Sequence, residues 1–126
     1  MDFELNEQQA ALRTMVRDFA EKEIAPVAQE LDDKEEFPYS IVKKMGELGL
    51  MGLYMPEEYG GGGADALSFA IATEELARVD ASVAVTPMVS QMAGSVLAYS
   101  GSEAQKRRWL PPLARGEIIG SFGLTE

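Results

Sequence analysis

The sequence predicts an all-α fold, an orthogonal or up-down bundle of about five helices followed by one short terminal strand. Three observations carry this prediction. Apolar side chains recur at helical spacing along most of the chain, helix-capping patterns occur at two separate places, and the last nine residues, IIGSFGLTE, form an apolar run typical of a strand. At 126 residues, the chain is long enough for one domain with one hydrophobic core.

The first helix is expected to run from about residue 7 to residue 31. Asn6, followed three residues later by Gln9, fits a capping box, in which the two side chains satisfy free N–H groups at the start of a helix. Pro26 lacks a backbone N–H, so it should kink or break this helix. The apolar residues that should share one buried face are Leu12, Met15, Val16 and Phe19.

Two further helices follow, separated by a glycine-rich loop. Pro38 suits the first turn of a helix that ends before Gly49, a residue type that commonly follows a helix C-terminus. Four consecutive glycines at residues 60–63 predict an irregular connection. Asp65 can then cap a third helix over about residues 66–79.

Residues 81–102 carry no charge, which raises the question of a membrane span. Several Ser, Thr and Gln side chains and one proline interrupt this run, and such polar groups are costly in lipid. We therefore predict no membrane span but a buried core helix over about residues 82–99. Ser102 and Gln105 repeat the capping-box pattern and open a short basic helix, which the pair Pro111–Pro112 should stop.

Two features indicate that the chain is part of something larger, either a longer polypeptide or an oligomer. A single terminal strand has no partner for its backbone N–H and C=O groups and is not stable alone. The fourth helix is apolar or small on all sides, and three amphipathic neighbours cannot bury such a helix completely. Because apolar surface would stay exposed, we expect self-association of the chain.

Composition excludes several classes of function. The formal net charge is −10, from 21 acidic and 11 basic residues, which argues against nucleic acid as a partner. The chain contains no Cys and no His, so disulfides, thiolate catalysis and the commonest metal ligands are excluded, and no metal site is predicted. Because there is no Cys and no apolar leader is visible, we expect a cytoplasmic protein.

The charged and glycine-rich motifs predict structure and no chemistry. The acidic pairs Glu57–Glu58 and Glu74–Glu75 could act as acid/base groups or metal ligands, but we interpret them as solvated helix faces and caps. The glycines at residues 60–63 lack the spacing of a nucleotide-binding loop. The basic residues 106–108 lie near the end of a helix, where they offset its dipole.

Four stretches, in this order and at this spacing, resemble the N-terminal part of the acyl-CoA dehydrogenases, a family of flavoenzymes. They are LGLMGLYMPEEYGG, EELARVDASVA, GSEAQKRRWLPPLARGE and the terminal FGLTE. The resemblance covers essentially the whole chain. It implies an N-terminal helical domain at residues 1–117 and, at residues 118–126, the first strand of a middle β-domain. In the family this strand continues into Pro and a Gly-Ser-Asp element, so we expect an excised or truncated piece of a longer enzyme.

The resemblance implies a cofactor, a substrate and a reaction. They are FAD, an acyl-CoA thioester and its α,β-dehydrogenation. By position, the residues that match flavin contacts in the family are Phe122, Leu124 and Thr125. For the first two, packing within a strand is the alternative interpretation, whereas the hydroxyl and backbone of Thr125 could bond the edge of the flavin.

The helix that lies beside the acyl chain in relatives matches the fourth helix predicted here. Ser90, Ala93 and Gly94 are therefore expected to line the acyl pocket, and close helix packing is the alternative role for such small residues. Many relatives carry a His-Asn-Ser-type stretch before this helix, where this chain has MVSQM at residues 88–92.

The resemblance places the catalytic glutamate, which removes the α-proton, in a C-terminal domain outside this sequence. No glutamate of this chain is therefore assigned a catalytic role, and we expect the chain alone to be inactive. The resemblance also implies an electron-transfer flavoprotein or similar acceptor as partner, and a homotetramer as the assembly of the full-length enzyme.

Two alternatives remain open on the sequence. The chain could be a self-standing helical interaction module that associates through its apolar faces, although a terminal strand without a partner argues against this. It could also come from an acyl-CoA oxidase or a flavin-dependent monooxygenase of the same architecture, which only the missing domains would distinguish.

Overall fold

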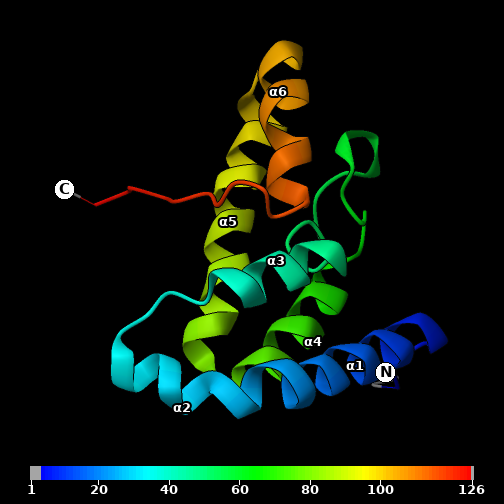
Figure 1. Cartoon of the computed structure of the whole chain (residues 1–126). Coiled ribbons are helices and arrows are strands. Elements are labelled where there is room, and N and C mark those ends of the chain that lie inside the picture. The colour runs from blue at the N-terminus through cyan, green and yellow to red at the C-terminus, as the bar shows by residue number, and fades with distance from the viewer. Residues whose placement is uncertain (1–3, 126) are drawn as a thin grey trace.

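The computed structural model describes residues 4–125, and its elements are helical throughout. Figure 1 shows α1 and α2 lying across the base of the molecule, crosswise to α5, with α6 beside the upper part of α5. The predicted all-α bundle is therefore confirmed. The elements are α1 (Glu7–Phe19), the π-helical turn η1 (Ala20–Ile24), α2 (Ala25–Lys34), α3 (Tyr39–Glu47), the 3₁₀ turn η2 (Glu57–Tyr59), α4 (Ala66–Ala77), α5 (Ala81–Ser100) and α6 (Glu103–Ala114).

The predicted first helix is divided into α1, η1 and α2. Its start is the capping box expected from the sequence, with Gln9 N–H donating to Asn6 Oδ1 at 2.8 Å. The interruption that Pro26 predicts takes the form of one wide π-helical turn, in which Ala25 N–H donates to the carbonyl of Ala20. Pro26 then occupies the first turn of α2, a position where proline is well tolerated.

The main core lies between α1, η1, α3, α4 and the first half of α5, and the loop after α3 also contributes to it. Val16, Ile24, Met45 and Leu76 are among its fully buried members. A second, smaller cluster joins η2 to α6 and consists of Met55, Tyr59, Leu110, Leu113 and Ala114. The elements thus form one packed body in which α5 links the two clusters.

Close backbone contact joins α3 to the end of α6. A Cβ atom added at Gly46 would lie 2.0 Å from the carbonyl oxygen of Arg115, so only glycine permits this approach. Gly116 has a φ of +68°, which turns the chain away from α6 and sets it against Val42 and Met51 of the main core. The contact between α3 and α6 therefore fixes where the terminal segment begins.

The expectation that Pro111 and Pro112 stop the last helix is wrong. Helix α6 continues through both residues to Ala114, and Arg115 N–H donates to the carbonyl of Pro111 at 3.1 Å. The two prolines remove the donors for the carbonyls of residues 107 and 108, both of which are exposed. Water can satisfy those carbonyls, so the loss of the two donors leaves no buried carbonyl without a partner.

The expected terminal strand is not present in the described residues. After Gly116, the chain through Thr125 is irregular, and Figure 1 shows it leaving the helices as an extended segment. A strand is defined by hydrogen bonds to a neighbour, and within residues 4–125 no neighbouring strand exists to supply them. Glu126, the last residue of the predicted strand, lies outside the described residues.

Helix α5 is long and apolar enough to pass as a membrane span by length and composition. Its mean hydropathy over an 18-residue window is 1.3. The core helix of a soluble protein passes the same test, so this observation is weak evidence for a membrane.

Candidate functional site

Helix α5 is anchored at both ends and presents two different faces. Asp80 caps its start by accepting a hydrogen bond from Val83 N–H at 3.1 Å. At its end, Gly101 N–H donates to the carbonyl of Leu97 at 2.9 Å. One face is packed against the rest of the protein through buried residues that include Val83, Ser90 and Gly94.

The other face of α5 carries a line of exposed apolar side chains, which we term the α5 stripe. The spacing of these residues places them along one side of a helix. They are between 37% and 89% exposed, which is unusual for so many large apolar groups on one helix. The members of the stripe are Val85, Met88, Met92, Val96 and Tyr99.

The terminal segment crosses α5 at one defined point. Gly120 N–H donates to the hydroxyl of Ser90, 3.1 Å away, and Ser90 is fully buried. A Cβ atom added at Gly120 would lie 2.7 Å from the Cβ of Ala93, so glycine is required for this contact. Ser90 and Ala93 therefore hold the segment that carries the predicted flavin contacts.

Beyond this anchor, the predicted cofactor residues are open to solvent. Phe122 is 38% exposed, Leu124 is 77% exposed, and Thr125 is also exposed. No backbone hydrogen bond of residues 121–125 to the rest of the described chain occurs. Two apolar side chains and an unpaired stretch of backbone are thus available to a further group, and assignment of these residues to FAD stays a prediction.

The three predicted acyl-pocket residues do not share one surface. Ser90 and Ala93 face the terminal segment, as described above. Gly94 instead makes room for Met55, whose Cε would lie 2.6 Å from a Cβ atom at that position. All three side chains allow close packing here, and their role toward an acyl group stays a prediction.

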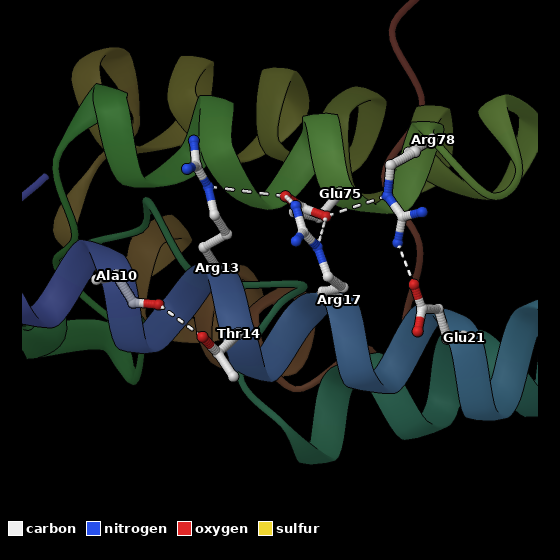
Figure 2. Close-up of polar contacts among 7 residues, drawn as sticks. All are labelled: Ala10, Arg13, Thr14, Arg17, Glu21, Glu75 and Arg78. Carbon is white, nitrogen blue, oxygen red and sulfur yellow. Dashed lines mark hydrogen bonds and ion pairs between the residues drawn. The ribbon is translucent and has the colours of Figure 1, made fainter. Parts of the chain in front are cut away.

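A buried carboxylate was missed by the sequence interpretation. Glu75 is 3% exposed, so its assignment to a solvated helix face is wrong. Figure 2 shows three arginines converging on it from α1 and from the end of α4. Arg17 donates to it at 2.7 and 2.9 Å, Arg78 at 3.3 Å, and Arg13 lies 3.7 Å away.

The cluster around Glu75 is held by α1 and α4 together. Arg78 also donates to Glu21 at 2.7 Å, which extends the link to η1. The hydrogen bonds from Arg17 hold the pKa of Glu75 below its usual value, although burial acts in the opposite direction. Because every contact is made by protein, the cluster is a clamp between helices and offers no free acid or base.

One signal in the sequence could have identified Glu75 as buried. It lies four residues after Ile71 and three after Ala72, and both are buried on the inner face of α4. A charged residue on the apolar face of a helix must be paired, and the partners come from α1, 58 and 62 residues away in the sequence. Helical periodicity thus indicates burial, but only the tertiary structure identifies the arginines.

The described residues contain no candidate metal centre. No group of three or more Asp and Glu side chains gathers closely enough there to hold a metal ion, and the sequence has no His or Cys. Surfaces that are open to a ligand include the α5 stripe, the terminal segment and the cavities along α5.

Comparison with known proteins identifies the family. Residues 6–117 match the family model described as "Acyl-CoA dehydrogenase, N-terminal domain". Because this match covers most of the chain, the protein belongs to the acyl-CoA dehydrogenase family. It is 51% identical to "Probable acyl-CoA dehydrogenase YngJ" of Bacillus subtilis over 127 aligned positions, covering 100% of this chain and 33% of that protein.

Solved structures share the fold along the entire chain. Butyryl-CoA dehydrogenase from Megasphaera elsdenii superposes with a TM-score of 0.90 at 39% identity, covering 100% of this chain and 34% of that one. A chain in a structure described as "Electron transferring flavoprotein of Acidaminococcus fermentans" gives a TM-score of 0.95 at 41% identity, with 100% and 33% covered. The present chain thus spans about a third of the length of the proteins it matches.

Proposed function

We propose that this chain provides the helical wall of the flavin and acyl site in an FAD-dependent acyl-CoA dehydrogenase. The observation that carries the proposal is the α5 stripe, an exposed apolar face on the same helix that anchors, through Ser90, an extended segment with unpaired backbone. Family membership supports an oxidoreductase that removes two hydrogens across the α and β carbons of an acyl-CoA. The reaction requires further domains, because the relatives are about three times as long.

The residues present fit a flavin. An isoalloxazine ring is planar, has apolar faces and carries hydrogen-bonding groups along its edge. The terminal segment offers Phe122 and Leu124 as apolar contacts, and Thr125 adds a hydroxyl beside free backbone groups. FAD, when bound, would supply the acceptor for the hydride that leaves the β carbon. The contribution of this chain would be to bind and orient the ring through its anchored segment.

The acyl group would lie along the α5 stripe. Met88 and Met92 are flexible, apolar and more than one-third exposed, so they can pack against an aliphatic chain and exclude water from it. Excluding water matters because removal of a proton next to a thioester creates an enolate that fixed dipoles stabilise better than bulk solvent does. The base that takes this proton would come from another domain, and an electron-transfer flavoprotein would be the electron acceptor.

A chimera tests this proposal. The corresponding N-terminal third of Megasphaera elsdenii butyryl-CoA dehydrogenase would be replaced by the present chain, which is 39% identical to it. We expect the chimera to retain FAD and its flavin absorbance to bleach when butyryl-CoA is added without oxygen. The chain alone should show no flavin reduction.

A matched pair of variants tests whether reduction of the flavin by butyryl-CoA depends on the α5 stripe. Met92→Lys in the chimera should weaken bleaching by butyryl-CoA, because a charge would lie against the acyl chain, whereas Leu67→Lys on α4 should leave it unchanged. A chimera that folds and binds FAD but is not reduced by any acyl-CoA would contradict the proposal.

A further inference from the structure

A cavity of about 410 Å³ lies between the second half of α5 and the loop that precedes α4. Its wall is built mainly of small residues, which include Gly63, Gly94 and Ala98. Two tyrosines stand at its rim: Tyr54 is 42% exposed and Tyr99 is 89% exposed. None of the residues that line it carries a charge. The cavity is therefore suited to a neutral group with a flat apolar part.

The polar part of this cavity is a pair of side chains on α5. Gln91 is only 5% exposed, and its Nε2 donates to the hydroxyl of Ser95 at 3.1 Å. The Oε1 of Gln91 is buried and has no hydrogen-bond partner. A buried polar atom without a partner is uncommon in folded proteins and costs stability. Gln91 therefore has an unused hydrogen-bonding position. Because Oε1 is closed to solvent in the structure, the side chain has to rotate slightly to present this position to the cavity that Gln91 lines.

The pair offers one donor and one acceptor whichever way the amide is oriented. In the structure, Oε1 of Gln91 is the free acceptor and the hydroxyl hydrogen of Ser95 is the free donor. If the amide is rotated by half a turn, Ser95 donates to Oε1, and then Nε2 becomes the free donor and the Ser95 oxygen the free acceptor. The complement of such a pair is a group that also carries a donor and an acceptor side by side.

We propose that this cavity is a binding site for a planar aromatic or cyclic amide. The C=O and N–H of the amide would pair with Gln91 and Ser95, and the ring would lie against Tyr54. The ring of Tyr54 is already held by Phe69, with their centroids 6.0 Å apart, so binding would not have to order it. Gly94 lines the cavity with its backbone, while the missing side chain leaves room for Met55 on the other side. This site is separate from the anchor at Ser90 and does not depend on the proposed dehydrogenase function.

Titration of the ¹⁵N-labelled 126-residue chain with benzamide tests the proposal. We expect saturable shifts of the Gln91 side-chain amide and of the Ser95 backbone amide, with a dissociation constant of about 1–10 mM, which is usual for a ligand of this size. Acetophenone keeps the ring and the carbonyl but lacks the donor, and it should bind about tenfold more weakly. Absence of saturable shifts around the cavity with benzamide would overturn the proposal.

Two variants and one control assign the binding to the polar pair. Gln91→Leu removes both polar ends at similar volume and should weaken benzamide binding about tenfold, while Ser95→Ala should weaken it about fivefold. Ser100→Ala, an exposed serine on the same helix, should bind like the unchanged chain. If Gln91→Leu does not fold, the affinity of Ser95→Ala for benzamide tests the role of the pair. Unchanged affinity in the folded variants would refute a role for the pair.

N-methylacetamide separates an aromatic ligand from a peptide group. It carries the same donor and acceptor without a ring, and we expect it to bind at least tenfold more weakly than benzamide. Equal binding of the two compounds would show that the tyrosine contributes nothing and that the site accepts the backbone of a protein partner. That outcome would overturn the proposed class of ligand.

Discussion

At the scale of single residues, Glu75 is the one charged side chain that is buried among the described residues. Its carboxylate is almost fully buried, while the three arginines that surround it are about half exposed. Water therefore solvates part of each guanidinium group, whereas the carboxylate of Glu75 has only the arginines to stabilise its charge. Removing the negative charge would leave the arginines to repel one another across the interface between α1 and α4.

Glu75→Gln should destabilise the fold by about 2 kcal/mol at neutral pH. This figure is below the roughly 3–5 kcal/mol for a fully buried pair because solvent screens the arginines. The pKa of Glu75 is lowered in the folded state, so its contribution is complete above the unfolded pKa of about 4.3 and is lost as the pH falls through the folded value. Urea unfolding at several pH values measures this.

The decisive comparison is between neutral and acidic solution. The difference in unfolding free energy between the unchanged chain and Glu75→Gln should shrink below about pH 4. Glu74→Gln is the matched control, because Glu74 is exposed on the same helix and should show little difference at any pH. A gap for Glu75→Gln that is constant with pH would contradict an ionised carboxylate in the clamp.

Tyr59 is a second residue whose environment can be measured directly. Its hydroxyl donates to Glu103 at 2.9 Å, and burial together with this acidic neighbour raises the pKa of Tyr59 to about 12. In an absorbance titration of the four tyrosines, we expect one phenolate to form near pH 12. Tyr59→Phe should abolish that phase, whereas Tyr39→Phe, which removes the hydroxyl of an exposed tyrosine, should not. If Tyr39→Phe abolished the absorbance change near pH 12, that change would belong to Tyr39 and not to Tyr59.

At the scale of elements, local patterns in the sequence predict where helices begin. Both capping boxes form as expected, at Asn6 and at Ser102, because they depend only on residues three apart. The effects of proline are predicted less well. Pro26 follows a π-helical turn, whereas α6 continues through the pair at residues 111–112, and the local sequence pattern predicts an interruption at both places.

Close approach between elements is a property that no local pattern reveals. Gly46 lies in the last turn of α3, and in a helix alanine is ordinarily favoured over glycine, by up to about 1 kcal/mol in an interior position. The structure instead places the carbonyl oxygen of Arg115 2.0 Å from where a Cβ would be, and a backbone atom cannot move aside cheaply. The reason for glycine lies 69 residues further along the chain.

Gly46→Ala should therefore destabilise the chain, by about 1–3 kcal/mol, despite its better helix propensity. Thermal unfolding followed by circular dichroism measures the effect. Gly123→Ala is the control, because a Cβ added there meets nothing within 4 Å, and we expect its melting temperature to match that of the unchanged chain. Equal stability of both variants would mean that α3 and the end of α6 are not in close contact.

At the scale of the whole molecule, the sequence predicts an incompletely buried fourth helix, and the α5 stripe is where this exposure lies. The sequence could not predict which side of the helix is exposed, because α5 is apolar or small on nearly every side. Contacts with α4, with α6 and with Gly120 decide that side. The same contacts separate Gly94 from Ser90 and Ala93, which adjacent positions in the sequence would group together.

An exposed line of large apolar side chains gives the isolated chain a surface for self-association. Burying such a surface is favourable by about 25 cal/mol per Å², which favours contact between two copies, while the net charge of −10 on each chain opposes it. Sedimentation velocity should show an average mass that rises with protein concentration.

The double variant Met88→Lys, Met92→Lys should sediment as a monomer, because two charges would have to be buried at the contact. The double variant Tyr39→Lys, Leu67→Lys changes the net charge equally at exposed sites away from α5 and should associate like the unchanged chain. If both double variants show the same rise in average mass with concentration, the chains associate through a surface other than the α5 stripe.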